Sequence, residues 1–200
     1  MANGKVLTGF SKPYVGLYAV NSGTVTYTQG MPLARGVSVS VSTETGDTND
    51  FYADNVLAES VGGVFTGATL TLTVDGLKEN ARKLIQGLPT ASTVTVGQNT
   101  VDVLDYDDRQ AIPYVGIGFI ARYMEDGVTT YTPVFFPKAI FSVDGLEAST
   151  QQETIEFQAQ ELEATVMRDD STNHKWRRIA EDQTSETDAE NVIKAFLNIA

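Results

Sequence analysis

The residues that could carry catalysis are few in this sequence. It contains one histidine, His174, and no cysteine, which excludes a thiol nucleophile, a disulfide and a thiolate metal site. His174 stands in a polar run beside Lys175 and Trp176, without a second histidine to complete a catalytic or metal site. We interpret it as a solvent-facing strand or loop residue, and we expect no cofactor, no metal and no enzymatic activity.

Four aspartates form the first of two acidic clusters. They are Asp102, Asp105, Asp107 and Asp108. Carboxylate oxygens can bind calcium, but this run lacks the spaced ligands, the turn glycine and the terminal glutamate of an EF-hand loop. A solvated acidic loop is therefore the favoured interpretation.

Four glutamates form the second cluster, in a segment whose alternation is typical of a strand. They are Glu153, Glu156, Glu161 and Glu163. Two such carboxylates could serve a glycosidase as acid and nucleophile. Because the other face of this segment is apolar, an ordinary exposed strand face is the more economical interpretation.

The charge of the chain narrows the classes of partner. The 200 residues carry a formal net charge of −12, and 42% of them are hydrophobic. Such an acidic surface would repel phosphate backbones and anionic lipid rather than bind them. No export signal and no apolar run of about 20 residues are present, so we expect a protein made in the cytosol that does not associate with membranes.

A long β-hairpin over residues 113–141 is the clearest element. Asp126-Gly127 favours a two-residue type I′ turn. That turn predicts a register in which residue 119 faces 134 and residue 117 faces 136. Gly116 and Gly118 leave the opposite face bare, so that either Phe135 or another element can pack there.

The remaining pattern is mostly that of β-strands. Residue 160 lies where apolar residues change from odd to even positions, which predicts a β-bulge near Gln160-Glu161. Hydroxyl residues alternate with apolar ones in two of the strands, giving each a polar and an apolar face. The predicted strands cover residues 5–10, 13–20, 24–28, 37–42, 64–74, 93–96, 100–104, 152–168 and 173–180.

Two helices are expected. The apolar stripe over residues 77–88 predicts an amphipathic helix that Asp75 caps and Gly87 ends. Thr187 and Glu190 form a capping-box pattern for a last helix that continues to residue 200. The expected fold is mainly β, a single sandwich or barrel-like domain with a flanking α-helix and a C-terminal helix.

A polar stretch is predicted to protrude from this domain as a loop over residues 43–55. Residues 43–50 contain no apolar side chain, and Phe51 and Tyr52 follow directly. Two aromatic side chains after a solvated loop need cover from this fold or from a neighbour.

The order of these landmarks is similar to that of the major tail tube proteins of siphophages, the long non-contractile-tailed phages, of Gram-positive bacteria. The resemblance covers almost the whole chain, and it lies in the ordered set rather than in one motif. The C-terminal helix does not match the family pattern. The residues that carry the resemblance are the Val-Ser-Val-Ser strand from Val37, Phe51 to Asn55, Thr66 to Leu70, Tyr114 to Phe119, Phe136 to Lys138, Ile155 to Gln158 and Thr165 to Arg168.

The resemblance implies a structural virion protein that forms rings, six subunits to a ring, which stack into a tube conducting phage DNA. Its partners would be further copies of itself, the tape measure, terminator and distal tail proteins, and DNA that passes without sequence-specific binding. The expected location is the virion tail.

Two sets of contact residues follow as hypotheses. The polar loop and its aromatics would bridge subunits or rings, and an acidic lumen would repel DNA and let it slide. The bridging set is Thr43, Glu44, Asp47, Asp50, Phe51, Tyr52 and Asp54. The lumen set is the two acidic clusters, Asp102, Asp105, Asp107 and Asp108 with Glu153, Glu156, Glu161 and Glu163.

Two alternatives remain open on the sequence. One is a β-sandwich binding module of a virion or cell surface, in which exposed aromatics such as Tyr131 or Trp176 form a platform for carbohydrate. The other is a glycosidase that uses two of the glutamates named above.

Overall fold

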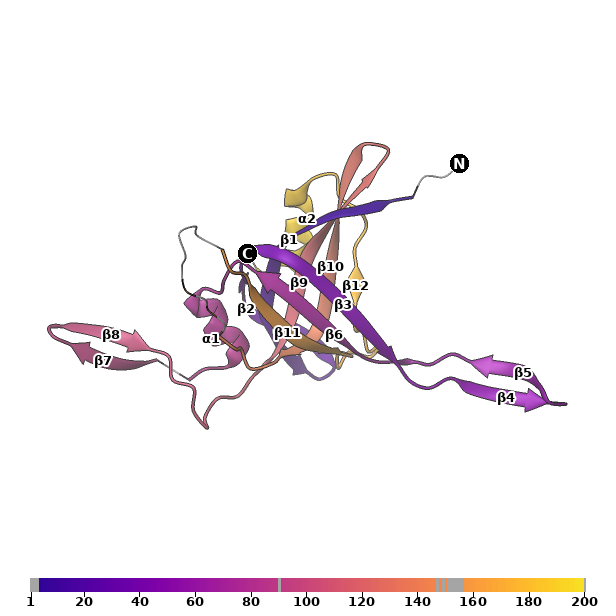
Figure 1. The fold of residues 1–200 in the computed structure, drawn as a ribbon, viewed down its shortest axis with the longest axis horizontal. Helices are drawn as coiled ribbons and strands as arrows, with labels where there is room; N and C mark the ends of the chain where they lie inside the picture. The colour runs from indigo at the N-terminus through magenta and orange to yellow at the C-terminus, as the bar shows by residue number, and fades with distance from the viewer. Residues whose placement is uncertain (1–3, 90, 147, 149, 151–156, 200) are drawn as a thin grey trace.

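One antiparallel sheet forms the centre of the molecule. The structure, a computed structural model, describes residues 4–89, 91–146, 148, 150 and 157–199. The sheet has the strand order β2-β1-β9-β10-β11-β6-β3, and a short β12 pairs with β10 (Figure 1). Its strands are β1 (Val6–Asn21), β2 (Thr24–Pro32), β3 (Gly36–Thr45), β6 (Phe65–Val74), β9 (Tyr114–Glu125), β10 (Val128–Phe141), β11 (Gln160–Met167) and β12 (Arg178–Ile179). The predicted mainly β fold is confirmed.

The β9–β10 hairpin has the predicted register. Asp126 and Gly127 have φ values of 50° and 81°, as a type I′ turn requires. Phe119 pairs with Val134, and Ile117 pairs with Phe136. A single local turn therefore sets the alignment of the two central strands.

The sheet curls so that its two halves share one core. Leu72 is aligned between Val39 of β3 and Leu162 of β11, with its side chain fully buried. These side chains belong to the same apolar cluster as Ile117 of β9. Phe10 of β1 lies against Gly36 at the start of β3, where an added Cβ would come within 2.1 Å of the ring. The two ends of the sheet therefore approach each other, giving a barrel-like shape.

Helix α1 (Glu79–Gln86) closes the core from one side. Ala81, Leu84 and Ile85 are buried in the main cluster, and Gly87 ends the helix with a φ of 57°. The predicted cap at Asp75 is wrong. Lys78 occupies the N-cap position without a side-chain hydrogen bond, because Asp75 accepts the backbone N–H of Arg35 at 2.9 Å instead.

Helix α2 (Glu186–Phe196) covers the outer face of the sheet. Ile193 lies over Gly118, where an added Cβ would be 2.7 Å from its Cγ2 atom. Phe135 also borders this glycine, so both predicted occupants of the bare face are present. The predicted capping box is wrong, because Ser185 caps the helix by accepting the backbone N–H of Asp188 at 3.1 Å.

Three other local predictions are corrected by the structure. β1 is one strand with irregular register between Ser11 and Tyr14, rather than two short strands. β11 pairs with β6 without a bulge from Gln160 onward, so the change of alternation marks the start of this strand. Of the predicted strand 173–180, only Arg178–Ile179 pairs with the sheet, alongside β10.

Two hairpins project from the body on opposite sides (Figure 1). One consists of β4 (Asn49–Ala53) and β5 (Val56–Val61), and the other of β7 (Ser92–Val96) and β8 (Asn99–Val103). Within the described residues, each forms a separate two-stranded sheet. The predicted loop 43–55 is therefore a hairpin: β3 continues to Thr45, and the projection extends to Val61.

Candidate assembly surfaces

The hairpin of β4 and β5, residues 49–61, is called the arm below. Asp54 and Asn55 form its turn with φ values of 51° and 62°. Every residue of its two strands is exposed, including Phe51 at 63% and Tyr52 at 62%. An isolated two-stranded hairpin is at best marginally stable in water. An arm with this much exposed apolar surface is typical of a segment that a partner covers.

The base of the arm is held closely by the body. The backbone N–H of Gly46 donates to the carbonyl of Val64 at 2.9 Å. Gly63 passes so close that an added Cβ would lie 1.9 Å from the carbonyl oxygen of Gly46. At the start of β6, Phe65 stacks on Trp176 with ring centroids 4.2 Å apart. The two segments that lead into the arm are therefore held together at its base.

The structure divides the predicted bridging residues into two groups. Thr43 and Glu44 belong to β3 and pair with Ala68 and Gly67 in the main sheet. The others lie in or beside the projection: Asp47 in its connection, Asp50, Phe51 and Tyr52 on β4, and Asp54 at the turn.

The second strand of the arm, β5, was not predicted from the sequence. Val56, Leu57 and Val61 are exposed at 64%, 50% and 65%, and Leu57 pairs with Tyr52. The signal was present as a short apolar run after Asp54-Asn55, but this turn lacks the glycine that marks most two-residue hairpins.

The first acidic cluster does not form one site. Asp102 lies on β8 opposite Thr93, whereas Asp105, Asp107 and Asp108 follow in the chain after this hairpin. Hydrogen bonds from the guanidinium and backbone N–H of Arg109 lower the pKa of Asp107. In the part of the chain that the structure describes, no three His, Asp or Glu side chains are placed to hold a metal ion.

Part of the second acidic cluster lies on a polar sheet face. Glu161 and Glu163 of β11 are exposed and pair with Thr73 and Thr71 of β6. On the other side of β6, Ser38 and Ser40 of β3 pair with the same two threonines. We call this surface, formed by these six residues, the hydroxyl-acidic face. Glu153 and Glu156 lie outside the described residues.

The side chains considered for other functions mostly have partners within the chain. His174 is exposed in a loop, and its Nδ1 atom lies 3.1 Å from the carbonyl oxygen of Asp169. Trp176 stacks on Phe65, and the Arg177 guanidinium lies 4.6 Å from the centre of its ring. Trp176 is thus already engaged by its own chain, which leaves less of its ring for a sugar.

Comparison with known proteins adds no family to these observations. No protein-family model matches the chain, and a search of curated proteins gives no match. Among the described residues, neither helix has the length and apolar character needed to span a membrane.

Proposed function

We propose that this protein is a structural subunit that assembles into stacked rings, forming a tube of the phage tail type that conducts DNA. The observation that carries the proposal is the arm. It is anchored at its base and exposed along its whole length, with two aromatic side chains that the monomer does not cover. A segment of this kind suits a contact between copies, because a neighbouring copy can cover its exposed aromatic side chains. A head-to-tail contact that does not close generates a stack.

The ends of the sheet support contacts of a second kind. β2 and β3 end the strand order, so each has one edge without a strand partner among the described residues. Natural proteins rarely leave long sheet edges open, because they pair with other chains. Neighbouring subunits in a ring are a means of covering them.

The charge distribution supports a passage for DNA. The net charge is −12, and the hydroxyl-acidic face carries Glu161 and Glu163 without a lysine or arginine among its six residues. A wall with positive charge would bind phosphates through release of counterions and retain the DNA. A polar, acidic wall repels phosphates, so DNA can slide past it.

Removing the arm tests the proposal. In the deletion of residues 49–61, Thr48 is joined to Gly62, and the contact between Gly46 and Val64 at the base remains available. We expect a folded subunit with unchanged thermal stability that no longer forms tubes in electron micrographs. A matched control is Asn55→Gly, which favours the same turn because residue 55 has a φ of 62°.

The two variants separate the possible results. Tubes from Asn55→Gly together with none from the deletion support the role of the arm. Normal tubes from the deletion variant would contradict it.

A further inference from the structure

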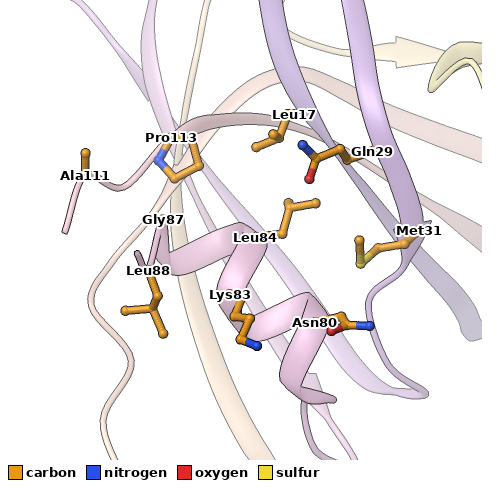
Figure 2. A pocket seen from close by; sticks show the side chains of 10 residues that line it. All are labelled: Leu17, Gln29, Met31, Asn80, Lys83, Leu84, Gly87, Leu88, Ala111 and Pro113. Carbon is orange, nitrogen blue, oxygen red and sulfur yellow. The ribbon is translucent and has the colours of Figure 1, made fainter. Parts of the chain in front are cut away.

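A groove lies between helix α1 and the strands β1 and β2. Its first part is a cavity of about 470 Å³, whose apolar lining includes Leu17, Met31, Leu84 and Leu88. Figure 2 shows Leu84 on the helix facing Leu17 and Met31 on the strands, whereas Lys83, which also lines the cavity, extends from the helix away from these three side chains. The groove therefore combines an apolar floor with a cation.

A second cavity continues this groove toward the start of α1. Its volume is about 600 Å³, and it shares Met31 and Asn80 with the first cavity. Arg35 and Lys78 also line it, and both are exposed. We call the two cavities together the α1 groove.

The charges of the arm and the α1 groove are opposite. Residues 43–64, which include the arm, contain five acidic residues and no lysine or arginine. Asp50, Asp54 and Glu59 are the acidic residues of the arm itself.

The α1 groove is lined by three basic residues, Arg35, Lys78 and Lys83, and by one acidic residue, Asp75. Arg35 pairs with Asp75, and Lys83 pairs with Glu79. Lys78 forms no ion pair with any other described residue, so its charge is available to a partner. In a chain with a net charge of −12, this is a favourable place for an acidic segment to dock.

The arm and the α1 groove also lie on opposite sides of the molecule. In Figure 1, whose horizontal direction is the longest axis, the arm projects to the right and α1 lies to the left of the sheet. A copy shifted along this axis brings its arm toward the α1 groove of the next copy. Because the two surfaces differ, the contact is head-to-tail. Between copies related by a shift along this axis, such a contact repeats without closing and produces a stack.

We propose that the α1 groove receives the arm of a second copy of this chain, with Phe51 and Tyr52 on its apolar floor and the arm's acidic residues near Lys78 and Lys83. This inference rests on the proposed function, since it names the surface on which the arm docks. Aromatic anchors that enter an apolar groove beside complementary charges are typical of the residues that dominate binding energy.

Cross-linking between two variants tests the docking directly. The chain has no cysteine, so single cysteines can be placed without background. Ala53→Cys, next to Tyr52 on the arm, and Asn80→Cys, at a residue that lines both cavities, leave the aromatic and basic side chains in place. The two variants are mixed, assembled and treated with a short bis-maleimide. Ser22→Cys, in the exposed turn between β1 and β2, replaces Asn80→Cys in the matched control. We expect cross-linked dimers from the first mixture and none from the second.

Charge reversal gives an independent test. The arm variant is Asp50→Lys/Asp54→Lys/Glu59→Lys, and the groove variant is Lys78→Glu/Lys83→Glu. Lys83 is half-buried and the other four side chains are exposed, and circular dichroism checks that each variant folds. We expect each set alone to abolish tubes and the combined variant to restore them.

The outcomes distinguish this inference from the proposed function. Tubes that form without the cross-link between residues 53 and 80, or that survive reversal of the α1 groove charges, contradict the docking site but still support assembly into tubes. If the unmodified chain never assembles, the proposed function fails, and the docking inference fails with it.

Discussion

Glu190 joins α2 to β1 through polar contacts. Its carboxylate accepts a hydrogen bond from the Tyr14 hydroxyl at 2.6 Å and forms ion pairs with Lys12 and Lys194. Partial burial alone would raise the pKa of Glu190, but the hydrogen bonds from Lys12, Tyr14 and Lys194 outweigh it and lower the pKa to about 2. The carboxylate is therefore favoured in its charged form in the folded protein.

Glu190→Gln should lower the free energy of unfolding by about 1–3 kcal/mol at neutral pH, because three donors lose a charged acceptor. The folded pKa of about 2 lies below the usual 4.5, so this stabilisation is present above the usual pKa. It is lost as the pH falls from about 4.5 to about 2.

Urea denaturation of wild type and Glu190→Gln over this pH range measures the effect. The difference between the two proteins should shrink as the pH falls, whereas the control Glu181→Gln, at an exposed glutamate, should differ little from wild type at any pH. If the difference in unfolding free energy between wild type and Glu190→Gln were constant with pH, the lowered pKa of Glu190 would be contradicted.

The spacing of Thr187 and Glu190 predicted a capping role, and the structure shows why it was wrong. Spacing along one helix describes only local partners, whereas Lys12 and Tyr14 come from a strand almost 180 residues earlier in the chain. Ser185 then serves as the cap. Long-range polar partners of this kind leave no signal in a single sequence.

At the scale of elements, two glycines in β9 leave room for groups that pack on the outer face of the sheet, and one of them borders α2. An added Cβ at Gly118 would come within 2.7 Å of Ile193 Cγ2 and 3.2 Å of Phe135 Cδ2. At Gly116, an added Cβ would lie 2.5 Å from the Tyr27 ring. The sheet face is left bare so that a helix and two aromatic rings can lie close to its backbone.

Gly118→Ala should therefore destabilise the fold by about 1–3 kcal/mol, because overpacking forces α2 or Phe135 to move. Gly145→Ala is the control, since an added Cβ there meets no atom within 4 Å. Its unfolding free energy should stay within about 0.5 kcal/mol of wild type. Chemical denaturation of both variants measures the difference, and a Gly118→Ala protein as stable as wild type would show that α2 does not pack as described.

The elements differ in how well the sequence predicts them. The β9–β10 hairpin was predictable with its register because Asp126-Gly127 is a strong local turn signal. The arm was predicted as a loop because Asp54-Asn55 is a weaker signal and apolar residues occur on both faces of β4 and β5. Alternation of apolar and polar residues identifies a strand that is buried on one face. It says little about a strand that is exposed on both faces.

At the scale of the whole molecule, the hydroxyl-acidic face is the part of the acidic clusters best suited to line a passage. Its residues come from three adjacent strands, whereas Asp102 stands on a projecting hairpin. We expect tubes of the Glu161→Lys/Glu163→Lys variant to retain short DNA duplexes in sedimentation, with retention falling steeply as salt rises. Wild-type tubes should retain none.

A variant with the same change of charge provides the control. Asp102→Lys/Asp108→Lys should retain much less DNA if these residues lie away from the channel. Equal retention by the two double variants would show that the effect comes from net charge alone, and the hydroxyl-acidic face would lose its assignment as the wall.

We expect many copies of this chain to assemble into a tube. Electron microscopy of the purified protein over a series of concentrations tests it most directly. We expect rings at low concentration and stacked tubes of increasing length at higher concentration. Single particles at every concentration would contradict it.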